Sequence, residues 1–143
     1  MKIAIGCDHA GFLYKEAIKV YLTKKGYEVL DCGTNSEESV DYPDFAHLVS
    51  NSVVDEKAKL GILICGTGNG VCISANKHMG IRAGLCWDPE IAKLIRQHND
   101  ANIMCLSARF SSEMTSIACV DAFINTEFEG GRHQRRVDKI TCV

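Results

Sequence analysis

The sequence lacks an excess of charge of either sign, a long apolar run, a CxxC pair and a linker rich in Pro or Ser. Its 16 Lys and Arg residues against 18 Asp and Glu residues give a net charge of −2, which argues against a protein that coats nucleic acid or an anionic membrane. No apolar run approaches the ~20 residues of a membrane span. The first apolar stretch is too short for a signal peptide, so we expect a cytoplasmic protein.

Cysteine, by contrast, is abundant: eight residues, at positions 7, 32, 65, 72, 86, 105, 119 and 142. Most of them stand in apolar segments, where a free cysteine packs as a small hydrophobic residue. The absence of a CxxC pair leaves little support for a zinc site or a thioredoxin-like redox motif. We therefore expect free thiols in a reducing compartment, of which one or two at most serve chemistry.

Short apolar runs alternate with helical patterns along the 143 residues, and apolar residues make up 46% of them. The expected strands cover residues 2–7, 27–33, 60–66, 81–87 and 102–108, and the expected helices cover 11–25, 43–55, 69–78, 89–98 and 111–124. On the first helix we expect Leu13, Ala17 and Val20 to share one apolar face, and Ser111 to cap the fifth helix. This alternation predicts one α/β domain over residues 1–143, a three-layer α/β/α Rossmann-like sandwich with a five-stranded parallel sheet.

Ligands of such sheets bind at the carboxyl ends of the strands, so residues just after strands are the candidates for function. Asp8 and His9 follow the first expected strand directly. They are positioned to face a ligand, but Asp8 is equally suited to cap the helix that follows.

The third expected strand ends at Cys65 and is followed by a loop with glycine at positions 66, 68 and 70. Backbone amides of such a loop can approach a phosphate or the oxyanion of an enediolate. No Gly-Lys-Ser/Thr follows, as a Walker A motif requires, and the spacing is not that of a dinucleotide-binding GxGxxG. A helix N-terminus favours the thiolate of a nearby cysteine, so Cys65 is the best reactive candidate, with a buried structural cysteine as the alternative.

Two further polar groups stand out in the second half of the chain. His98 and Asn99 end the fourth expected helix; a surface histidine is the plain alternative there. Arg132 and Arg136 are four residues apart in a short basic helix, so one face can present both guanidinium groups to a phosphate. Arg109, after the fifth strand, is another phosphate candidate. A solvated tail is the alternative, and a nucleic-acid patch is disfavoured because aromatic partners are missing.

Together these segments resemble one family, the ribose-5-phosphate isomerase B / galactose-6-phosphate isomerase sugar isomerases. The matching pieces are GCDHAG (6–11), DCGT (31–34), DYPDFA (41–46), ILICGTGNG (62–70), SANK (74–77), GIRAGLC (80–86), RQHNDAN (96–102) and EGGRHQRRVDKI (129–140). With DCGT grouped with DYPDFA, and ILICGTGNG with SANK, these pieces form six motifs in the same order, spread over nearly the whole chain, which makes the resemblance specific.

The resemblance implies the interconversion of ribose 5-phosphate and ribulose 5-phosphate, a pentose phosphate pathway reaction, through a cis-enediolate without a metal or other cofactor. Cys65 matches the family's catalytic base. Some members use a glutamate just past the loop instead, but that position is Val71 here. Thr67 would move a proton between O1 and O2. His98 would open the sugar ring, with Asp8 and Tyr42 at the anomeric end.

For substrate binding, the resemblance implies contacts from the loop amides, from Asn99 and from a phosphate clamp. The implied residues are His9, Gly66, Gly68, Asn69, Gly70, Asn99, Arg109, Arg132 and Arg136. It also implies a homo-oligomer, a dimer or a dimer of dimers, with active sites at the interface and with the basic helix at about 131–140 packed on a partner subunit.

Two residues beside the loop depart from the pattern common in cysteine-type members. Asn69 stands where an apolar residue is frequent, and Cys72 where serine is frequent. Three alternatives therefore stay open beside the ribose 5-phosphate reaction: allose-6-phosphate isomerase, galactose-6-phosphate isomerase and a non-catalytic sugar-phosphate-binding module. The galactose enzyme divides its catalytic residues between two different subunits. Cys65, Tyr42 and His98 coexist in this chain, which favours a self-sufficient homo-oligomer.

Overall fold

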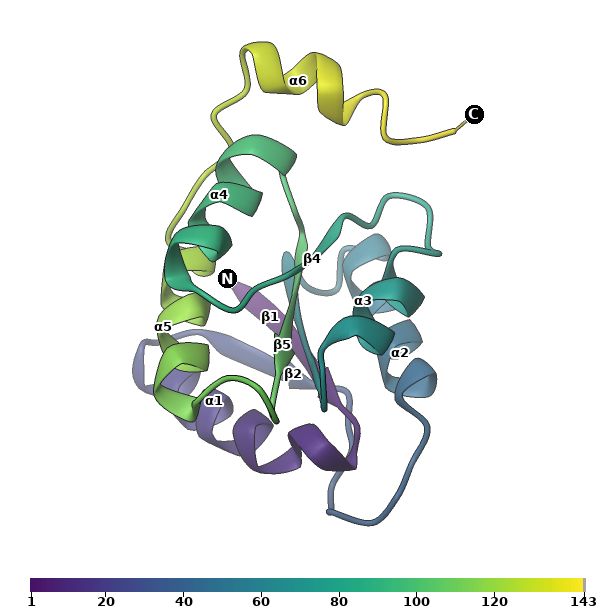
Figure 1. The fold of residues 1–143 in the computed structure, drawn as a ribbon, viewed down its shortest axis with the longest axis vertical. Helices are drawn as coiled ribbons and strands as arrows, with labels where there is room; N and C mark the ends of the chain where they lie inside the picture. The colour runs from purple at the N-terminus through teal and green to yellow at the C-terminus, as the bar shows by residue number, and fades with distance from the viewer. Residues whose placement is uncertain (143) are drawn as a thin grey trace.

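The computed structural model describes residues 1–142, and across them a five-stranded, all-parallel sheet lies between two layers of helices (Figure 1). The strands are β1 (Lys2–Cys7), β2 (Glu28–Asp31), β3 (Leu60–Cys65), β4 (Ala83–Leu85) and β5 (Ile103–Ser107). The helices are η1 (His9–Gly11, a 3₁₀ turn), α1 (Phe12–Lys24), α2 (Tyr42–Val54), α3 (Asn69–Ala75), α4 (Pro89–Asn99), α5 (Glu113–Ile124) and α6 (Arg132–Val137). The predicted α/β/α sandwich is confirmed, with most elements a few residues shorter than expected.

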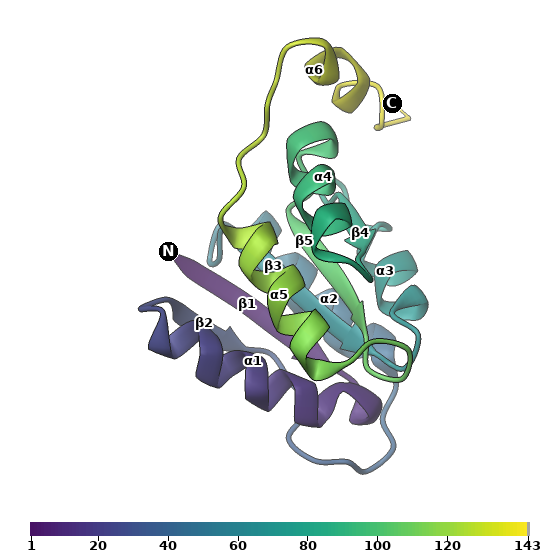
Figure 2. The same cartoon turned by 60° about the vertical axis from the view of Figure 1, so that its left-hand side comes forward.

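Alternate residues along the central strands build one core on each face of the sheet. Ile62 and Ile64 of β3 point toward α1, α4 and α5, while Leu63 and Cys65 point toward α2 and α3. Figures 1 and 2 show these two helical layers on opposite sides of the sheet. Both faces are covered, which explains why β3 is apolar along its whole length.

The strand order is β2-β1-β3-β5-β4. The strand that follows β1 in the chain is added on one side of it, and the strands that follow β3 are added on the other side, so the topological switch point lies between β1 and β3. The connections after these two strands leave on opposite faces, through α1 and through α3. A crevice forms at the carboxyl ends of strands at such a switch point, and this is where open α/β sheets bind ligands. Asp8 follows β1 and Cys65 ends β3, so both stand at this point.

Helix α1 buries a different face from the one expected. Leu13 and Val20 are exposed, and the helix instead turns Ile18 and Leu22 toward the sheet. Lys15, which is not on the apolar face expected from the sequence, is completely buried. The reason is an ion pair that the sequence pattern does not reveal. Lys15 Nζ lies 2.7 Å from Oδ2 of Asp31, the last residue of β2.

Lys15 also donates to Glu16 at 2.8 Å, and Lys19 donates to Asp31 at 2.6 Å. Burial alone would raise the pKa of Asp31, but the hydrogen bonds from Lys15 and Lys19 hold this pKa below its usual value. The favourable contribution of Asp31 is therefore present at neutral pH and lost in acid, as pH falls through the lowered pKa.

We expect Lys15→Met to lower the free energy of unfolding by about 2 kcal/mol, because it leaves Asp31 with one of its two lysine partners. The cost stays below that of a fully buried broken pair, since Asp31 is partly exposed and keeps Lys19. Urea unfolding of Lys19→Met is the matched control: Lys19 is partly exposed, so its loss costs less. Equal costs for the two variants would contradict a special role for the buried lysine.

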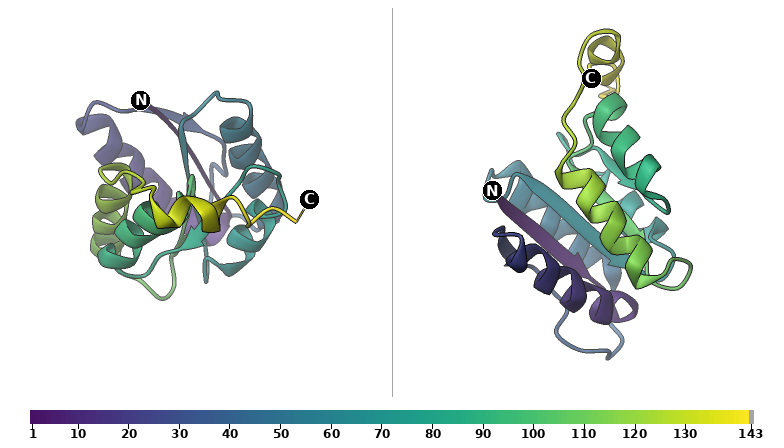
Figure 3. Two further views of the ribbon diagram at one scale, coloured as in Figure 1. Left: turned by 90° about the horizontal axis from the view of Figure 1, so that it is seen from above. Right: turned by 90° about the vertical axis from the view of Figure 1, so that its left-hand side faces the viewer.

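The last two helices complete the layer on the α1 side and extend beyond it. Ser112, rather than Ser111, caps α5: its Oγ accepts the amide of Thr115 at 3.0 Å, while the carbonyl of Ser111 accepts the Tyr14 hydroxyl. Helix α6 lies apart from the sheet, beyond the C-terminal end of α4 (Figure 3). Among the helices of residues 1–142, none has the length and apolarity to cross a membrane.

Candidate active site

The loop after β3 surrounds the sulfur of Cys65. This side chain is 4% exposed, and its Sγ accepts the backbone N–H of Gly68 at 3.2 Å. A thiolate accepts such a bond more strongly than a thiol does. This contact confirms the prediction from the sequence that Cys65 lies close to the amides of the glycine loop.

Gly68 can close the loop around Cys65 only because it has no side chain. Its φ of +80° lies in the left-handed region, and a Cβ atom there would lie 2.4 Å from Leu85 Cδ1 and 3.0 Å from the Leu106 carbonyl. Both the backbone conformation and the packing therefore require glycine.

We expect Gly68→Ala to destabilise the protein by about 2–4 kcal/mol and to remove most activity, because the loop must open to admit the methyl group. Gly80→Ala is the matched control: Gly80 has a φ of +85°, but a Cβ atom there would have no neighbour within 4 Å, so only the backbone cost of about 1 kcal/mol applies. Chemical unfolding and turnover measured on both variants would separate the two effects, and equal losses would contradict the close approach.

The loop after β5 holds the glycine loop from one side. Ser107 Oγ donates to the carbonyl of Gly66 at 2.7 Å, and the Arg109 amide donates to the same oxygen at 3.0 Å. The Arg109 guanidinium packs against Gly66, where a Cβ atom would lie 3.2 Å from its Nη1. The structure thus brings Arg109 to the glycine loop, as expected for a group that faces a phosphate or an oxyanion.

Tyr42 covers the other end of the same loop. It is the first residue of α2, is 40% exposed, and its ring lies over Gly70, where a Cβ atom would lie 2.6 Å from the ring. Together, Tyr42 and Arg109 flank a backbone loop that carries no side chain at positions 66, 68 and 70.

Asp8 and His9 lie next to this loop, at the adjacent strand end. Asp8 donates its amide to the carbonyl of Ile64 at 3.3 Å, and its Oδ1 caps η1 by accepting the amides of Ala10 and Gly11. One carboxylate oxygen of Asp8 therefore caps the helix, as the alternative interpretation of this residue predicted. His9 Nδ1 accepts the amide of Val40 at 3.2 Å, which fixes the loop that leads to Tyr42.

Two of the loop amides are already engaged. Gly68 N–H donates to Cys65, and Asn69 N–H donates to Thr67 Oγ1 at 3.2 Å. The first backbone N–H groups of a helix have no acceptor within the helix. In the first turn of α3, this leaves the N–H groups of Gly70 and Val71 available to a ligand. Sequence reasoning included Gly70 among the expected donors but not Val71.

Five other thiols have pKa values above the usual range of cysteine. Burial raises the pKa of Cys7 and Cys86 to about 12 and that of Cys119 to about 11, and it raises the pKa of Cys105 and Cys32 as well. These thiols stay protonated and serve packing, as expected. Cys72 is different, because a hydrogen bond with Cys105 outweighs burial and lowers its pKa.

A second polar group lies at the C-terminal end of α4. His98, Asn99 and Arg136 line a cavity of about 290 Å³ between α4 and α6. The His98 ring stacks on that of His133, with centroids 4.3 Å apart and planes 17° apart. Burial, followed by the charges of His98 and Arg132, lowers the pKa of His133.

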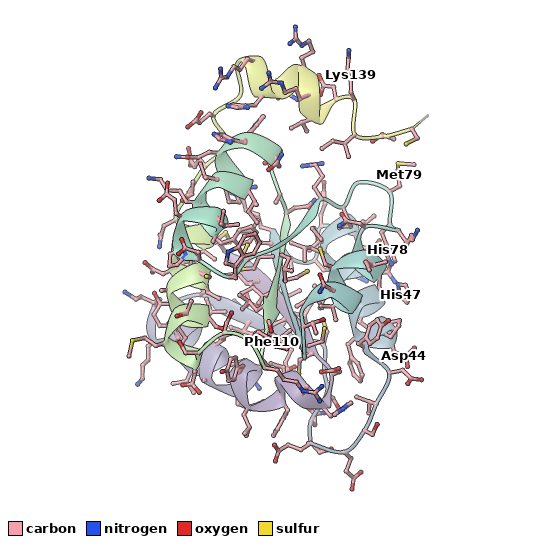
Figure 4. All side chains as sticks on the ribbon, viewed as in Figure 1. Asp44, His47, His78, Met79, Phe110 and Lys139 are labelled. Atoms are coloured by element: carbon pink, nitrogen blue, oxygen red, sulfur yellow. The ribbon has the colours of Figure 1, made fainter. Side chains whose placement is uncertain are left out.

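These two groups of candidate residues lie at opposite ends of the sheet within one chain. Helix α4 begins beside the carboxyl ends of the strands at Pro89, and His98 comes nine residues later, so it is displaced by about 14 Å along the helix axis. Figure 4 shows the same separation between Phe110, in the loop after β5, and Lys139, just after α6. Thus Cys65, Thr67, Tyr42, Asp8, His9 and Arg109 gather at one end, and His98, Asn99, Arg132 and Arg136 at the other.

Known proteins share this fold and sequence over nearly the whole chain. The Ribose/Galactose Isomerase family model matches residues 3–140. Ribose-5-phosphate isomerase B of Escherichia coli is 47% identical over 99% of this chain and 95% of its own.

Solved structures agree. A ribose 5-phosphate isomerase from Thermotoga maritima superposes with a TM-score of 0.97 at 53% identity, covering 99% of this chain and 98% of its own. Ribose-5-phosphate isomerase B from Mycoplasma genitalium, with bound ribulose 5-phosphate, superposes with a TM-score of 0.93 at 48% identity, covering 97% of this chain and 93% of its own. The chain therefore belongs to the Ribose/Galactose Isomerase family.

Proposed function

We propose that this protein interconverts ribose 5-phosphate and ribulose 5-phosphate through a cis-enediolate, in the cytoplasm. The observation that carries the proposal is the sulfur of Cys65 at the switch point of the sheet, held against a loop of backbone amides. The relatives named ribose-5-phosphate isomerase B support the substrate, as does the ribulose 5-phosphate bound by the Mycoplasma genitalium protein.

In this proposal Cys65 is the base that takes the proton from C2 of the open-chain aldose and returns it to C1. Thr67, whose hydroxyl lies beside the loop, transfers the proton between O1 and O2. The negative oxygen of the intermediate accepts hydrogen bonds from those loop amides that Cys65 and Thr67 do not already engage, and losing one such donor costs ~3–4 kcal/mol. One base can serve both C2 and C1 because the two carbons are neighbours on the same face of a cis-enediolate, while Thr67 serves the two oxygens.

The remaining candidates handle the ring and the phosphate. His98 protonates the ring oxygen while Asp8 and Tyr42 hold the anomeric end, and Asn99 binds a hydroxyl. Asp8 Oδ1 is used as a cap, so its other oxygen is the one assigned to the substrate. The phosphate is held by His9, Arg109, Arg132 and Arg136, and Gly66, Gly68, Asn69 and Gly70 line the loop beside the reacting carbons.

These assignments require two copies of the chain. Because His98 and the two arginines of α6 lie at the far end of the sheet from Cys65, one subunit supplies the base and the loop, and its partner supplies ring opening and the phosphate arginines. A homodimer with twofold symmetry then holds two such shared sites. The projection of α6 away from its own sheet supports this arrangement, since it leaves the helix free to pack on a partner (Figure 1).

We expect Arg136→Ala mainly to raise KM for ribose 5-phosphate, by a factor of about 10–100, because a charged hydrogen bond to the phosphate is lost. Steady-state kinetics would check this, with Arg135→Ala as the matched control, since Arg135 lies next in sequence but outside the cavity lining. An unchanged KM would contradict the phosphate clamp.

The direct test of the proposed function is kcat/KM for ribose 5-phosphate against allose 6-phosphate and galactose 6-phosphate. We expect the five-carbon sugar to be preferred. Preference for a six-carbon substrate would select one of the alternative isomerases. Binding of all three sugars without turnover would identify a non-catalytic sugar-phosphate-binding module.

A further inference from the structure

Two histidines outside the proposed active site face each other across helices α2 and α3. His47 lies on α2, and His78 follows α3 by three residues. His47 Nδ1 and His78 Nε2 are 2.7 Å apart, with ring centroids at 4.9 Å and an angle of 52° between the planes. Figure 4 shows both side chains on the outer side of the α2–α3 layer, away from the sheet.

The geometry points to a site for a divalent transition-metal ion, with Zn²⁺ the prime candidate, bound by His47 Nδ1 and His78 Nε2. Two imidazoles on one zinc ion, each at about 2.0–2.1 Å, have nitrogens about 3.3 Å apart in a tetrahedral arrangement. To admit the ion, the two nitrogens must move from 2.7 Å to about 3.3 Å apart, and both rings must turn so that their lone pairs point at it. Water would complete the coordination, because His47 is exposed and His78 partly so.

The protonation state of the pair suits a metal. A hydrogen bond between two ring nitrogens requires that at least one of them carries a lone pair, and metal binding uses the neutral imidazole. Burial, followed by the charge of His47, lowers the pKa of His78, so protons compete weakly for this nitrogen at neutral pH. Asp44 stands three residues before His47 on the same side of α2 and adds a negative charge nearby (Figure 4).

A second group of metal-binding residue types, His98, Glu129 and His133, is less suited to the ion. Its ligand atoms lie within 4.8 Å of one another, a wider spread than the 2.7 Å of the outer pair. The two imidazoles are stacked nearly parallel, so their lone pairs do not converge on one point. Arg132 and Arg136, on the same short helix as His133, add positive charge that opposes a cation.

The test is calorimetric titration of the full-length protein, kept reduced with a phosphine, with Zn²⁺. We expect one ion per chain, and binding weaker by at least about 10–100-fold in His47→Asn and in His78→Asn. Two controls address the other ligands: Glu129→Gln removes the alternative group, and Cys142→Ser removes the exposed thiol. Neither should change the affinity.

Thermal unfolding gives a second readout. Zn²⁺ should raise the Tm of the wild type and of both controls but not of the two histidine variants, whose Tm without metal verifies that they fold. The inference is overturned if the wild type binds no ion, if both histidine variants bind as tightly as the wild type, or if Glu129→Gln or Cys142→Ser abolishes binding.

Discussion

Replacing Cys65 with alanine is expected to lower kcat for ribose 5-phosphate isomerisation by at least about 10³-fold, since Cys65 is the base assigned to the C2 proton. The variant should still bind substrate, because the phosphate arginines and the loop amides are untouched. Removing Sγ leaves the buried Gly68 amide without its acceptor, which costs the fold about 1–3 kcal/mol. Turnover and the dissociation constant of the sugar phosphate are the two measurements.

Cys72→Ser is the informative control for this experiment. Cys72 lies in the helix that follows the same loop, and a hydrogen bond with Cys105 lowers its pKa, so it is the thiol to compare with Cys65. If Cys65 is the base, Cys72→Ser should keep most of the wild-type turnover. Substantial isomerisation by Cys65→Ala, or its loss in Cys72→Ser alone, would transfer the role of base from Cys65.

Mixing two inactive variants is expected to restore activity. In a heterodimer of one Cys65→Ala chain and one His98→Asn chain, one shared site carries both defects and the other carries none. The purified heterodimer should therefore turn over at about half the wild-type rate per dimer, although each variant homodimer is inactive. The two chains would be co-expressed with different affinity tags, and the doubly tagged species assayed.

This experiment separates a shared site from a self-contained one. If each chain formed its own complete site, every site in the heterodimer would carry one defect, and turnover would stay at the level of the homodimers. Combining Cys65→Ala with Thr67→Ala is the matched control, since both residues belong to the same end of the sheet. Here each heterodimer site carries one defect, and no recovery is expected.

The sequence predicted the order and type of the elements because each one depends on local patterns. β3 is apolar throughout, and the Asp88-Pro89 start of α4 supplies a side-chain cap and a preset first turn. The motifs after the strands likewise identified Cys65 and the glycine loop, because the chemistry of that loop depends on residues adjacent in the chain.

Other features depend on contacts between distant parts of the chain, and the sequence pattern missed them. The inward face of α1 was misplaced because Lys15 is held inside by Asp31, 16 residues away. Val71 was not recognised as a candidate amide donor, because whether an amide is free depends on which neighbouring amides Cys65 and Thr67 engage.

What the amino-acid sequence by itself determined is the parallel α/β architecture, the strand ends that carry reactive residues, and the family. Only the tertiary structure decided the strand order, and with it the meeting of the loops after β1 and β3 at one crevice. It also decided that His98 and α6 lie at the opposite end of the sheet from Cys65. The physical reason is that residues near in sequence fix local conformation, whereas crossovers and helix direction fix which strand ends and helix ends share a side of the molecule.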